Sequence, residues 1–216
     1  MARRDSGVLP PGAQAYYAEN AEALADRYDS LSFAAVHQEV LPFLPTPPAR
    51  AADIGAGSGR DAVALMELGY AVTAVEPVRE LREAAAHRHR KALVWLEDSL
   101  PKLDRLEGEF GLFLLSAVWM HLTNTERPWA MARLGELLTA GGRLILTLRH
   151  GPPPRDRRMF DVPASETVEL ALRYGLRLVH QGGGGDRLGR DEVHWTQLVF
   201  EKRDSAGTDM TDRGGP

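Results

Sequence analysis

The hydrophobic positions of the chain change their spacing repeatedly between residues 50 and 202. Short apolar runs bounded by glycine, proline or acidic residues alternate with stretches in which apolar residues recur at helical spacing. The short runs predict buried strands, and the wider spacing predicts amphipathic helices. The seven runs that predict strands are Ala51–Ile54, Tyr70–Val75, Ala92–Leu96, Phe110–Leu115, Arg143–Leu148, Leu176–His180 and Val193–Phe200.

Signals for helix starts and stops lie between these runs. A Ser or Thr before an apolar-periodic stretch predicts an N-cap, Pro predicts a first helical residue, and Gly predicts the end of a helix. These signals predict four helices: one from Ser58 to Gly69, one that starts at Pro77, one from Thr125 to Gly141–Gly142, and one from Pro163 to Tyr174.

Strands that alternate with helices predict right-handed crossovers and a parallel sheet. The last two strands are joined by Gly182–Gly185 and a polar loop without a helix, which favours an antiparallel final pair. We therefore expect an α/β fold: a doubly wound, seven-stranded, mostly parallel sheet with an antiparallel last strand and helices on both faces.

Three zones divide the chain. Residues 50–202 hold the alternating pattern and are expected to form the main domain. Residues 1–49 form an extension in which apolar side chains between positions 17 and 28 share one helical face. Residues 203–216 contain almost nothing to bury, which predicts a disordered tail.

The composition excludes several classes of protein. The chain has 216 residues and a mass of 23.8 kDa, and its 44% hydrophobic and 26% charged content is that of an ordinary globular protein. The net charge of −4 argues against binding to nucleic acid. No apolar run approaches a membrane span, the N-terminus lacks the apolar core of a signal peptide, and the absence of cysteine excludes disulfides and thiolate metal sites. We expect a cytoplasmic monomer or homodimer that binds neither nucleic acid nor membranes.

A glycine-rich loop, Asp53-Ile54-Gly55-Ala56-Gly57-Ser58-Gly59-Arg60, follows the first expected strand. Glycines let the backbone turn tightly and let a ligand approach closely. The spacing of the glycines, with Arg60 after them, departs from the dinucleotide fingerprint G-x-G-x-x-G/A, and no phosphate-binding G-x-x-x-x-G-K-[ST] loop occurs. The carboxylate of Asp53 would repel a phosphate and suits a cationic or amino-bearing ligand.

This loop resembles motif I of the class I S-adenosylmethionine-dependent methyltransferases. Glu76 ends the second expected strand, 21 residues after Gly55, as does the family's ribose-binding acid. Asp98-Ser99-Leu100 follows the third strand, as does the family's adenine-binding acid. The order of elements over residues 50–202 is similar too, so the resemblance implies S-adenosylmethionine as cofactor.

The resemblance also implies roles for individual residues. Asp53 would hold the amino group of the methionine portion, assisted by the backbone carbonyl of Ser116. Glu76 would accept both ribose hydroxyls, and Asp98 would accept the adenine amino group. The N-terminal helices would form a short lid over the cofactor. The residues expected to bind the cofactor are Asp53, Gly55, Ala56, Gly57, Gly59, Glu76, Pro77, Asp98, Ser99, Leu100, Ser116, Tyr17 and Tyr28.

Each of these residues also has a purely structural interpretation. Glu76 could be an acid that interacts with a helix N-terminus, Asp98 a turn residue, and the glycine loop a tight turn without a ligand. Tyr17 and Tyr28 could pack onto the sheet edge.

The loops after the fourth and fifth strands are expected to face the methyl acceptor. His121 and His150 are the candidate general bases, because an imidazole titrates near neutral pH. Arg149 could bind a carboxylate or phosphate of the acceptor through two hydrogen bonds. Both histidines could equally be hydrogen-bonded loop residues, and the three arginines within residues 155–158 are expected to be solvated.

A small molecule is the expected acceptor. The Asp/Asn-Pro-Pro-Tyr/Phe motif of many adenine and glutamine N-methyltransferases is absent after the fourth strand, where Leu115-Ser116-Ala117-Val118 stands. No acidic cluster suggests a metal site, and we expect no appended recognition domain. The sequence predicts O-, N- or carboxyl methylation by in-line transfer. The alternatives are transfer or cyclisation of the cofactor's aminobutyrate arm and a non-catalytic S-adenosylmethionine-binding module.

Overall fold

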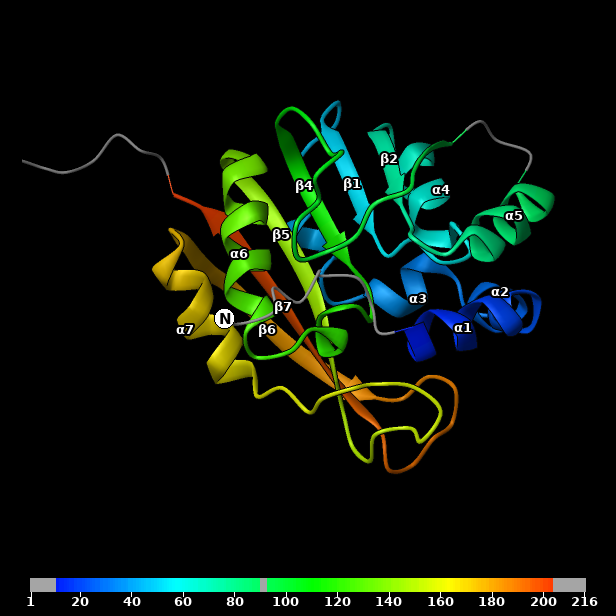
Figure 1. Ribbon diagram of the computed structural model, residues 1–216. Helices are drawn as coiled ribbons and strands as arrows, with labels where there is room; N and C mark the ends of the chain where they lie inside the picture. The colour runs from blue at the N-terminus through cyan, green and yellow to red at the C-terminus, as the bar shows by residue number, and fades with distance from the viewer. Residues whose placement is uncertain (1–10, 90–92, 204–216) are drawn as a thin grey trace, which may run out of the picture.

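The computed structural model describes residues 11–89 and 93–203 (Figure 1). Its centre is a seven-stranded sheet in the order β3-β2-β1-β4-β5-β7-β6. The strands β1 to β5 pair in parallel, and β7 is antiparallel to both β5 and β6. This arrangement confirms the expected fold class. The strands are β1 (Arg50–Ile54), β2 (Ala71–Val75), β3 (Val94–Leu96), β4 (Phe110–Leu115), β5 (Leu138–His150), β6 (Leu176–Gly185) and β7 (His194–Lys202).

Two strands are longer than the hydrophobic pattern predicts. β5 begins at Leu138, directly after a helix, so Gly141–Gly142 lie within the strand and do not end a helix. The register between β4 and β5 shifts between Phe110 and Leu112, which accommodates the extra residues as a bulge. β6 continues through Gly182–Gly185, assigned to a loop from the sequence, because each of these glycines pairs with a residue of β7.

Helices cover both faces of the sheet, and β4 shows how. Its alternate residues point to opposite faces, so Phe113 joins the apolar cluster under α6 and α7, whereas Leu112 and Leu114 join the cluster under α4. Full burial of a side chain of this size contributes about 1.5–3 kcal/mol. The helices after β1 are α4 (Arg60–Glu67), α5 (Arg79–Arg88), the 3-10 helix η2 (Trp119–His121), α6 (Glu126–Leu137) and α7 (Ala164–Arg173).

Residues 11–43 form the N-terminal helical segment. It comprises α1 (Pro11–Glu19), α2 (Ala21–Asp29), α3 (Phe33–His37) and the 3-10 helix η1 (Leu41–Phe43). The helical face expected over positions 17–28 is interrupted at Asn20, between α1 and α2. Leu24 nevertheless packs with Val78 and Leu81 at the start of α5. Figure 1 shows α1, α2 and α3 grouped near α4 and α5.

Two helix starts differ from the predicted ones. The N-cap of α4 is Gly59, at φ +81°, and the Ser58 hydroxyl donates to Asp29 Oδ1 at 2.7 Å instead of capping the helix. A left-handed backbone favours glycine, so conformation sets this cap rather than a side chain. α5 starts at Arg79 and not at Pro77, because residue 78 between them is extended.

Within residues 11–89 and 93–203, no helix is both long enough and apolar enough to cross a lipid bilayer. The expected tail falls outside these ranges from residue 204 onward.

Candidate functional site

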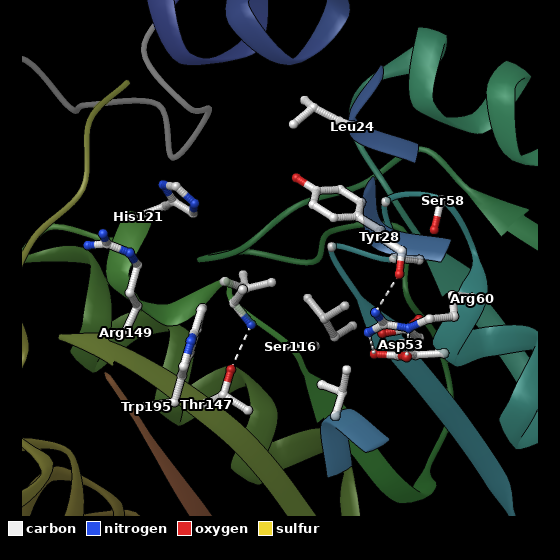
Figure 2. A pocket seen from close by; sticks show the side chains of 18 of the residues that line it. Leu24, Tyr28, Asp53, Ser58, Arg60, Ser116, His121, Thr147, Arg149 and Trp195 are labelled. Atoms are coloured by element: carbon white, nitrogen blue, oxygen red, sulfur yellow. Dashed lines mark hydrogen bonds and ion pairs between the residues drawn. The ribbon is translucent and has the colours of Figure 1, made fainter. Parts of the chain in front are cut away.

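A cavity of about 490 Å³ lies where β1, β2, β4 and β5 end, a volume suited to a small-molecule ligand. Figure 2 shows its two sides facing each other, with the loop after β4 between them. The glycine-loop side consists of residues 53–58, 60–61, 76–78 and 98–100. The β5–β7 side consists of Thr147, Arg149, Arg157, Met159, residues 183–188, Arg190, Trp195 and Gln197.

The backbone of the glycine loop comes close to its neighbours. Gly55 and Gly57 have φ angles of +70° and +55°. A Cβ at Gly55 would lie 2.6 Å from Cγ2 of Val118, and a Cβ at Gly57 would lie 3.5 Å from the ring of Tyr28. A side chain at either position would strain the left-handed backbone, and at Gly55 it would also clash with Val118.

Glu76 occupies the end of β2 and is only 4% exposed. Its Oε2 accepts the backbone N–H of Gly57 and its Oε1 accepts that of Val78, both at 2.9 Å. Burial raises the pKa of Glu76, although these two N–H groups oppose the shift. Each oxygen keeps a lone pair for a further donor. Glu76 can therefore hold these backbone N–H groups, as its structural interpretation requires, and still accept hydrogen bonds from a pair of hydroxyls.

Asp53 has a buried oxygen without a partner. The residue is 1% exposed, and no side chain or backbone group of the described residues bonds to its Oδ2. Burial, followed by the neighbouring Asp61, raises the pKa of Asp53 well above its usual range. An unpaired buried carboxylate is costly, so a cationic group in the cavity would stabilise it. This orphaned oxygen fits the amino-bearing ligand that the sequence predicts.

Asp61 is the centre of a buried ionic network that the sequence did not reveal. Its Oδ2 accepts Nε2 of His37 at 2.9 Å, and Nε of Arg60 donates to its Oδ1 at 2.6 Å. Arg60 also donates to the backbone carbonyl of Tyr28 at 2.9 Å. Burial opposes the ionisation of Asp61, but His37 and Arg60 outweigh it and lower its pKa. The network ties the N-terminal helical segment to the glycine loop.

Asp98 lines the cavity together with Ser99 and Leu100. Its Oδ1 accepts the backbone N–H of Ser99 at 2.8 Å, and its Oδ2 accepts those of Arg105 and Leu106 at 2.7 and 3.1 Å. The carboxylate thus fixes a turn, which is its structural interpretation. Oδ1 still has capacity for a second donor, and contact with an adenine amino group stays a prediction.

The loop after β4 is held in an uncommon conformation. Ala117 has φ +61°, and its N–H donates to Oγ1 of Thr147 on β5 at 2.8 Å. Non-glycine residues with left-handed backbone cluster at functional sites. The bond fixes Ser116, which lines the cavity as expected. The roles of its carbonyl and of Pro77, which also lines the cavity, stay predictions.

His121 is a buried imidazole, 7% exposed, at the end of η2. Nδ1 must donate to the carbonyl of Arg158, 2.8 Å away, because a carbonyl only accepts. Nε2 is then the acceptor for the hydroxyl of Tyr17, 3.1 Å away. Burial lowers the pKa of His121, which favours the neutral ring. Burial likewise raises the pKa of Tyr17 and keeps its hydroxyl protonated.

Both lid tyrosines reach the cavity. Tyr17 contacts His121, as above, and Tyr28 lies over Gly57. Burial raises the pKa of Tyr28 to about 12, so it is uncharged at neutral pH. Their predicted contact with a cofactor carboxylate stays a prediction.

Two predicted site residues lie outside the cavity lining. His150 alternates with Arg149 along β5, so Arg149 points into the cavity while His150 pairs with Asp161 and Thr196, both at 3.0 Å. This geometry favours His121 over His150 as the general base, and a role for His150 stays a prediction. Gly59 faces the ring of Trp95, 3.2 Å from the position of a Cβ, so its role is packing and helix geometry.

The β5–β7 side contains residues that sequence reasoning missed. Arg157, expected to be solvated, lines the cavity with its guanidinium 4.8 Å from the ring of Tyr16. For Trp119 and Trp195 the sequence leaves a pocket position and a core position equally open. Trp195 lines the cavity, whereas Trp119 is fully buried in the core. The run Gly182–Gly185 was the available signal for this side, because an unbroken series of glycines in a strand leaves a wall without side chains.

The chain matches known proteins over its sheet. Residues 52–146 match the family model described as a methyltransferase domain. An uncharacterized methyltransferase of Bacillus cytotoxicus is 27% identical over 125 residues, which are 57% of this chain and 55% of that protein. The chain spans about half the length of the curated relatives it matches.

Solved structures share the fold. The 1,6-didemethyltoxoflavin-N1-methyltransferase of Burkholderia thailandensis, with bound 1,6-didemethyltoxoflavin and S-adenosylhomocysteine, is 21% identical and has a TM-score of 0.64 over 94% of this chain and 99% of that chain. The magnesium protoporphyrin IX methyltransferase of Synechocystis PCC 6803, with bound S-adenosylmethionine, is 16% identical and has a TM-score of 0.61 over 84% of this chain and 79% of that chain. Residues 52–146 therefore match the methyltransferase-domain family, and the chain has the fold of the class I, S-adenosylmethionine-dependent methyltransferases.

Proposed function

We propose that the protein transfers a methyl group from S-adenosylmethionine to a small-molecule acceptor, with His121 as general base. One observation carries the proposal. The unpaired Oδ2 of Asp53 and the lone pairs of Glu76 line the same cavity as His121, whose neutral ring is poised to accept a proton.

The residues of the glycine-loop side fit this cofactor. S-adenosylmethionine, when bound, supplies an electrophilic methyl group on a cationic sulfur. The carboxylate of Asp53 pairs with the ammonium group, which removes the cost of its buried, partnerless oxygen. The carboxylate of Glu76 accepts the two ribose hydroxyls while it holds the N–H groups of Gly57 and Val78. Gly55 and Gly57 line the cavity without side chains of their own, so a ligand can approach the loop backbone closely.

His121 supplies the proton chemistry. Its Nδ1–H is fixed on the carbonyl of Arg158, so the tautomer leaves Nε2 as the base. An acceptor hydroxyl or amine takes the place of the Tyr17 hydroxyl at Nε2 and gives up its proton there during transfer. Nucleophiles that arrive unprotonated need only alignment and exclusion of water.

The size of the cavity favours a small acceptor. A volume of about 490 Å³ has to hold both the cofactor and the acceptor, which leaves room for a compact molecule. The Burkholderia thailandensis enzyme, whose fold is similar over its whole length, is named for a small-molecule acceptor, and this supports the same class here.

Calorimetric titration of the purified chain with S-adenosylmethionine, S-adenosylhomocysteine and NAD tests the cofactor. We expect about micromolar dissociation constants for the first two, within the usual range for enzyme ligands, and no binding of NAD. Binding of NAD alone, or of none of the three, would overturn the assignment.

A turnover assay tests the transfer. The chain is incubated with S-adenosylmethionine and a small-molecule panel, and mass spectrometry identifies the products. Products heavier by one methyl group, formed with S-adenosylhomocysteine, support methyl transfer. Products that carry the aminobutyrate arm would contradict it, and tight cofactor binding without any turnover would point to a binding module.

A further inference from the structure

The two sides of the cavity carry opposite charge. The glycine-loop side presents four carboxylates, and its Arg60 is already bound to one of them. Those carboxylates belong to Asp53, Asp61, Glu76 and Asp98. The β5–β7 side has four arginines and two carboxylates, that of Asp186 and that of Glu39, which reaches from the N-terminal helical segment to Gly182 of β6. Those arginines are Arg149, Arg157, Arg187 and Arg190. The acidic side suits a cationic cofactor, so the charge of the basic side indicates what kind of methyl acceptor binds there.

Asp186 does not neutralise the basic side, because it is fully engaged by one arginine. Its Oδ1 accepts Nη2 of Arg190 at 2.6 Å and its Oδ2 accepts Nε at 2.9 Å. The indole N–H of Trp195 donates to Oδ1 at 3.0 Å. Burial opposes the ionisation of Asp186, but Arg190 and Trp195 outweigh it and lower its pKa. Asp186 and Arg190 together carry no net charge, and the bond to Asp186 fixes the orientation of the Trp195 indole.

Arg149 is a buried cation without a carboxylate. It is 8% exposed, and its Nη1 donates only to backbone carbonyls, such as that of Pro152 at 3.0 Å. Its Nε is buried without a partner, and none of the described carboxylates forms an ion pair with it. Burial, followed by Arg190 and Arg157, lowers the pKa of Arg149. An unpaired buried charge is costly, so the cavity is built to receive an anion.

Arg157 adds a second cation to the same region. Its Nε is buried without a partner, and its guanidinium lies over the rings of Tyr16 and Tyr17, 4.8 and 5.8 Å from their centres. Its closest carboxylate contact is with Asp156, at 3.4 Å. The tyrosines orient this guanidinium without removing its charge.

The sheet register places a flat surface beside Arg149. Arg149 pairs with Trp195 across β5 and β7, and Trp195 pairs with Gly184 across β7 and β6. Residues that pair directly across strands share a face of the sheet. A Cβ at Gly184 would meet no atom within 4 Å, so one flank of the indole is open. Figure 2 shows Arg149 and Trp195 next to each other at the cavity.

Resting on the proposed function, we propose that the acceptor is an aromatic oxyanion, whose ring packs against Trp195 and whose carboxylate or phosphate is bound by Arg149 and Arg157. The anion anchors the molecule, and a second group, a hydroxyl or a ring nitrogen, receives the methyl. The lone pair of that atom forms the new bond to carbon as the carbon–sulfur bond breaks towards sulfur, and its proton goes to Nε2 of His121.

Matched probes test the charge. The full chain, saturated with S-adenosylhomocysteine, is titrated calorimetrically with hydroxybenzoates, hydroxyphenyl phosphates and the neutral hydroxybenzamides. We expect at least one class of anion to bind about tenfold or more tightly than its amide counterpart, because hydrogen bonds to a charged group are stronger than those to a neutral one. The two anion arms distinguish a carboxylate from a phosphate acceptor. Equal binding of anions and amides, or binding of neither, would overturn the proposal.

Arginine variants test the location. Arg149→Gln should weaken anion binding about tenfold or more and abolish the preference over amides. Arg149→Lys keeps the positive charge and should retain part of the affinity for anions. The control is Arg155→Gln, an exposed arginine in the same segment that does not line the cavity. Unchanged anion affinity in Arg149→Gln would contradict the proposal.

Affinity for S-adenosylhomocysteine should stay the same in every variant, which verifies folding. Failure of the chain to bind S-adenosylhomocysteine at all would instead refute the proposed function, so the two failures are distinguishable.

Discussion

The two sides of the cavity are assembled by different means. On the glycine-loop side, groups come from short segments directly after β1, β2 and β3, which are neighbours in the sheet. Much of that side is backbone held by Glu76 and Asp98. On the β5–β7 side, the groups are long side chains from segments far apart in sequence, brought together by the antiparallel pairing of β5, β7 and β6. A side built largely from backbone suits a ligand that stays the same, such as the cofactor. On a side built from side chains, a few substitutions would be enough to change which acceptor binds.

The largest expected effect concerns His121, which lines the cavity and belongs to neither of the two sides as defined above. His121→Asn should lower kcat by about a hundredfold to ten-thousandfold, the range for loss of a general base. Affinity for S-adenosylhomocysteine should not change. Because burial lowers the pKa of His121, the wild-type rate should fall only at pH values below the usual histidine pKa of about 6.5.

His150→Ala is the matched control for this experiment, since His150 lies outside the cavity. Its turnover should equal that of the wild type. A large loss in His150→Ala with normal turnover in His121→Asn would reverse the assignment of the base.

The second test separates the ionic network under the glycine loop from the cavity itself. Asp61→Ala leaves Arg60 and the fully buried His37 without their carboxylate, and should lower the free energy of unfolding by about 3 kcal/mol, measured by urea denaturation. Because the pKa of Asp61 is lower in the folded state, its contribution is complete above the unfolded value of about 3.9 and is lost as the pH falls below it.

The difference in stability between wild type and Asp61→Ala should accordingly shrink in acid. A difference that grew as the pH fell would contradict the ionised, paired carboxylate.

The third test addresses the glycine-loop side alone. Glu76→Ala removes an acceptor from the N–H groups of Gly57 and Val78 and from the proposed ribose contact, so affinity for S-adenosylhomocysteine should drop about a hundredfold. Calorimetry measures it directly. Glu80→Ala, an exposed acid on α5, is the control and should bind normally. Normal binding by Glu76→Ala would mean that this side has been assigned the wrong ligand.

The smallest expected effect is a pH dependence of cofactor binding. Burial raises the pKa of Asp53, and an ammonium group binds to its ionised form. Affinity should therefore increase as the pH rises through that pKa, by at most about tenfold per pH unit. Titrations of S-adenosylhomocysteine between about pH 5 and pH 8 detect it. Asp53→Asn should bind more weakly with a flatter profile, and an equally steep profile in that variant would assign the titration to another group.

The contrast between the two sides also explains what the sequence could predict. The positions of the strands along the chain and the residues that end β1, β2 and β3 follow from local hydrophobic runs and the acids behind them, as Asp53 and Glu76 illustrate. The pairing of Arg149 with Trp195 and of Trp195 with Gly184 depends on register between distant strands, for which no local pattern exists. His37 and Asp61 are likewise 24 residues apart and meet only through packing.

Errors in the prediction had local causes of a different kind. His150 and Arg149 are adjacent in sequence, and only the face that each takes on β5 separates the cavity residue from the outside one. β5 continues beyond the predicted Arg143–Leu148 at both ends, and the bulge near its start obscures the alternation. The sequence pattern assigns Gly182–Gly185 to the connection between the last two strands, although they complete β6; glycine is uncommon inside strands, so no local signal extends the strand over them.

The attachment of the N-terminal helical segment has a consequence for the timing of the reaction. Tyr28 lies over Gly57, and Arg60 and Ser58 bond to Tyr28 and Asp29 from below. A ligand bound between this segment and the glycine loop would have to wait for these contacts to open before it could leave. Variants that weaken the contacts would then shorten its residence time and accelerate turnover wherever product departure is the slow step.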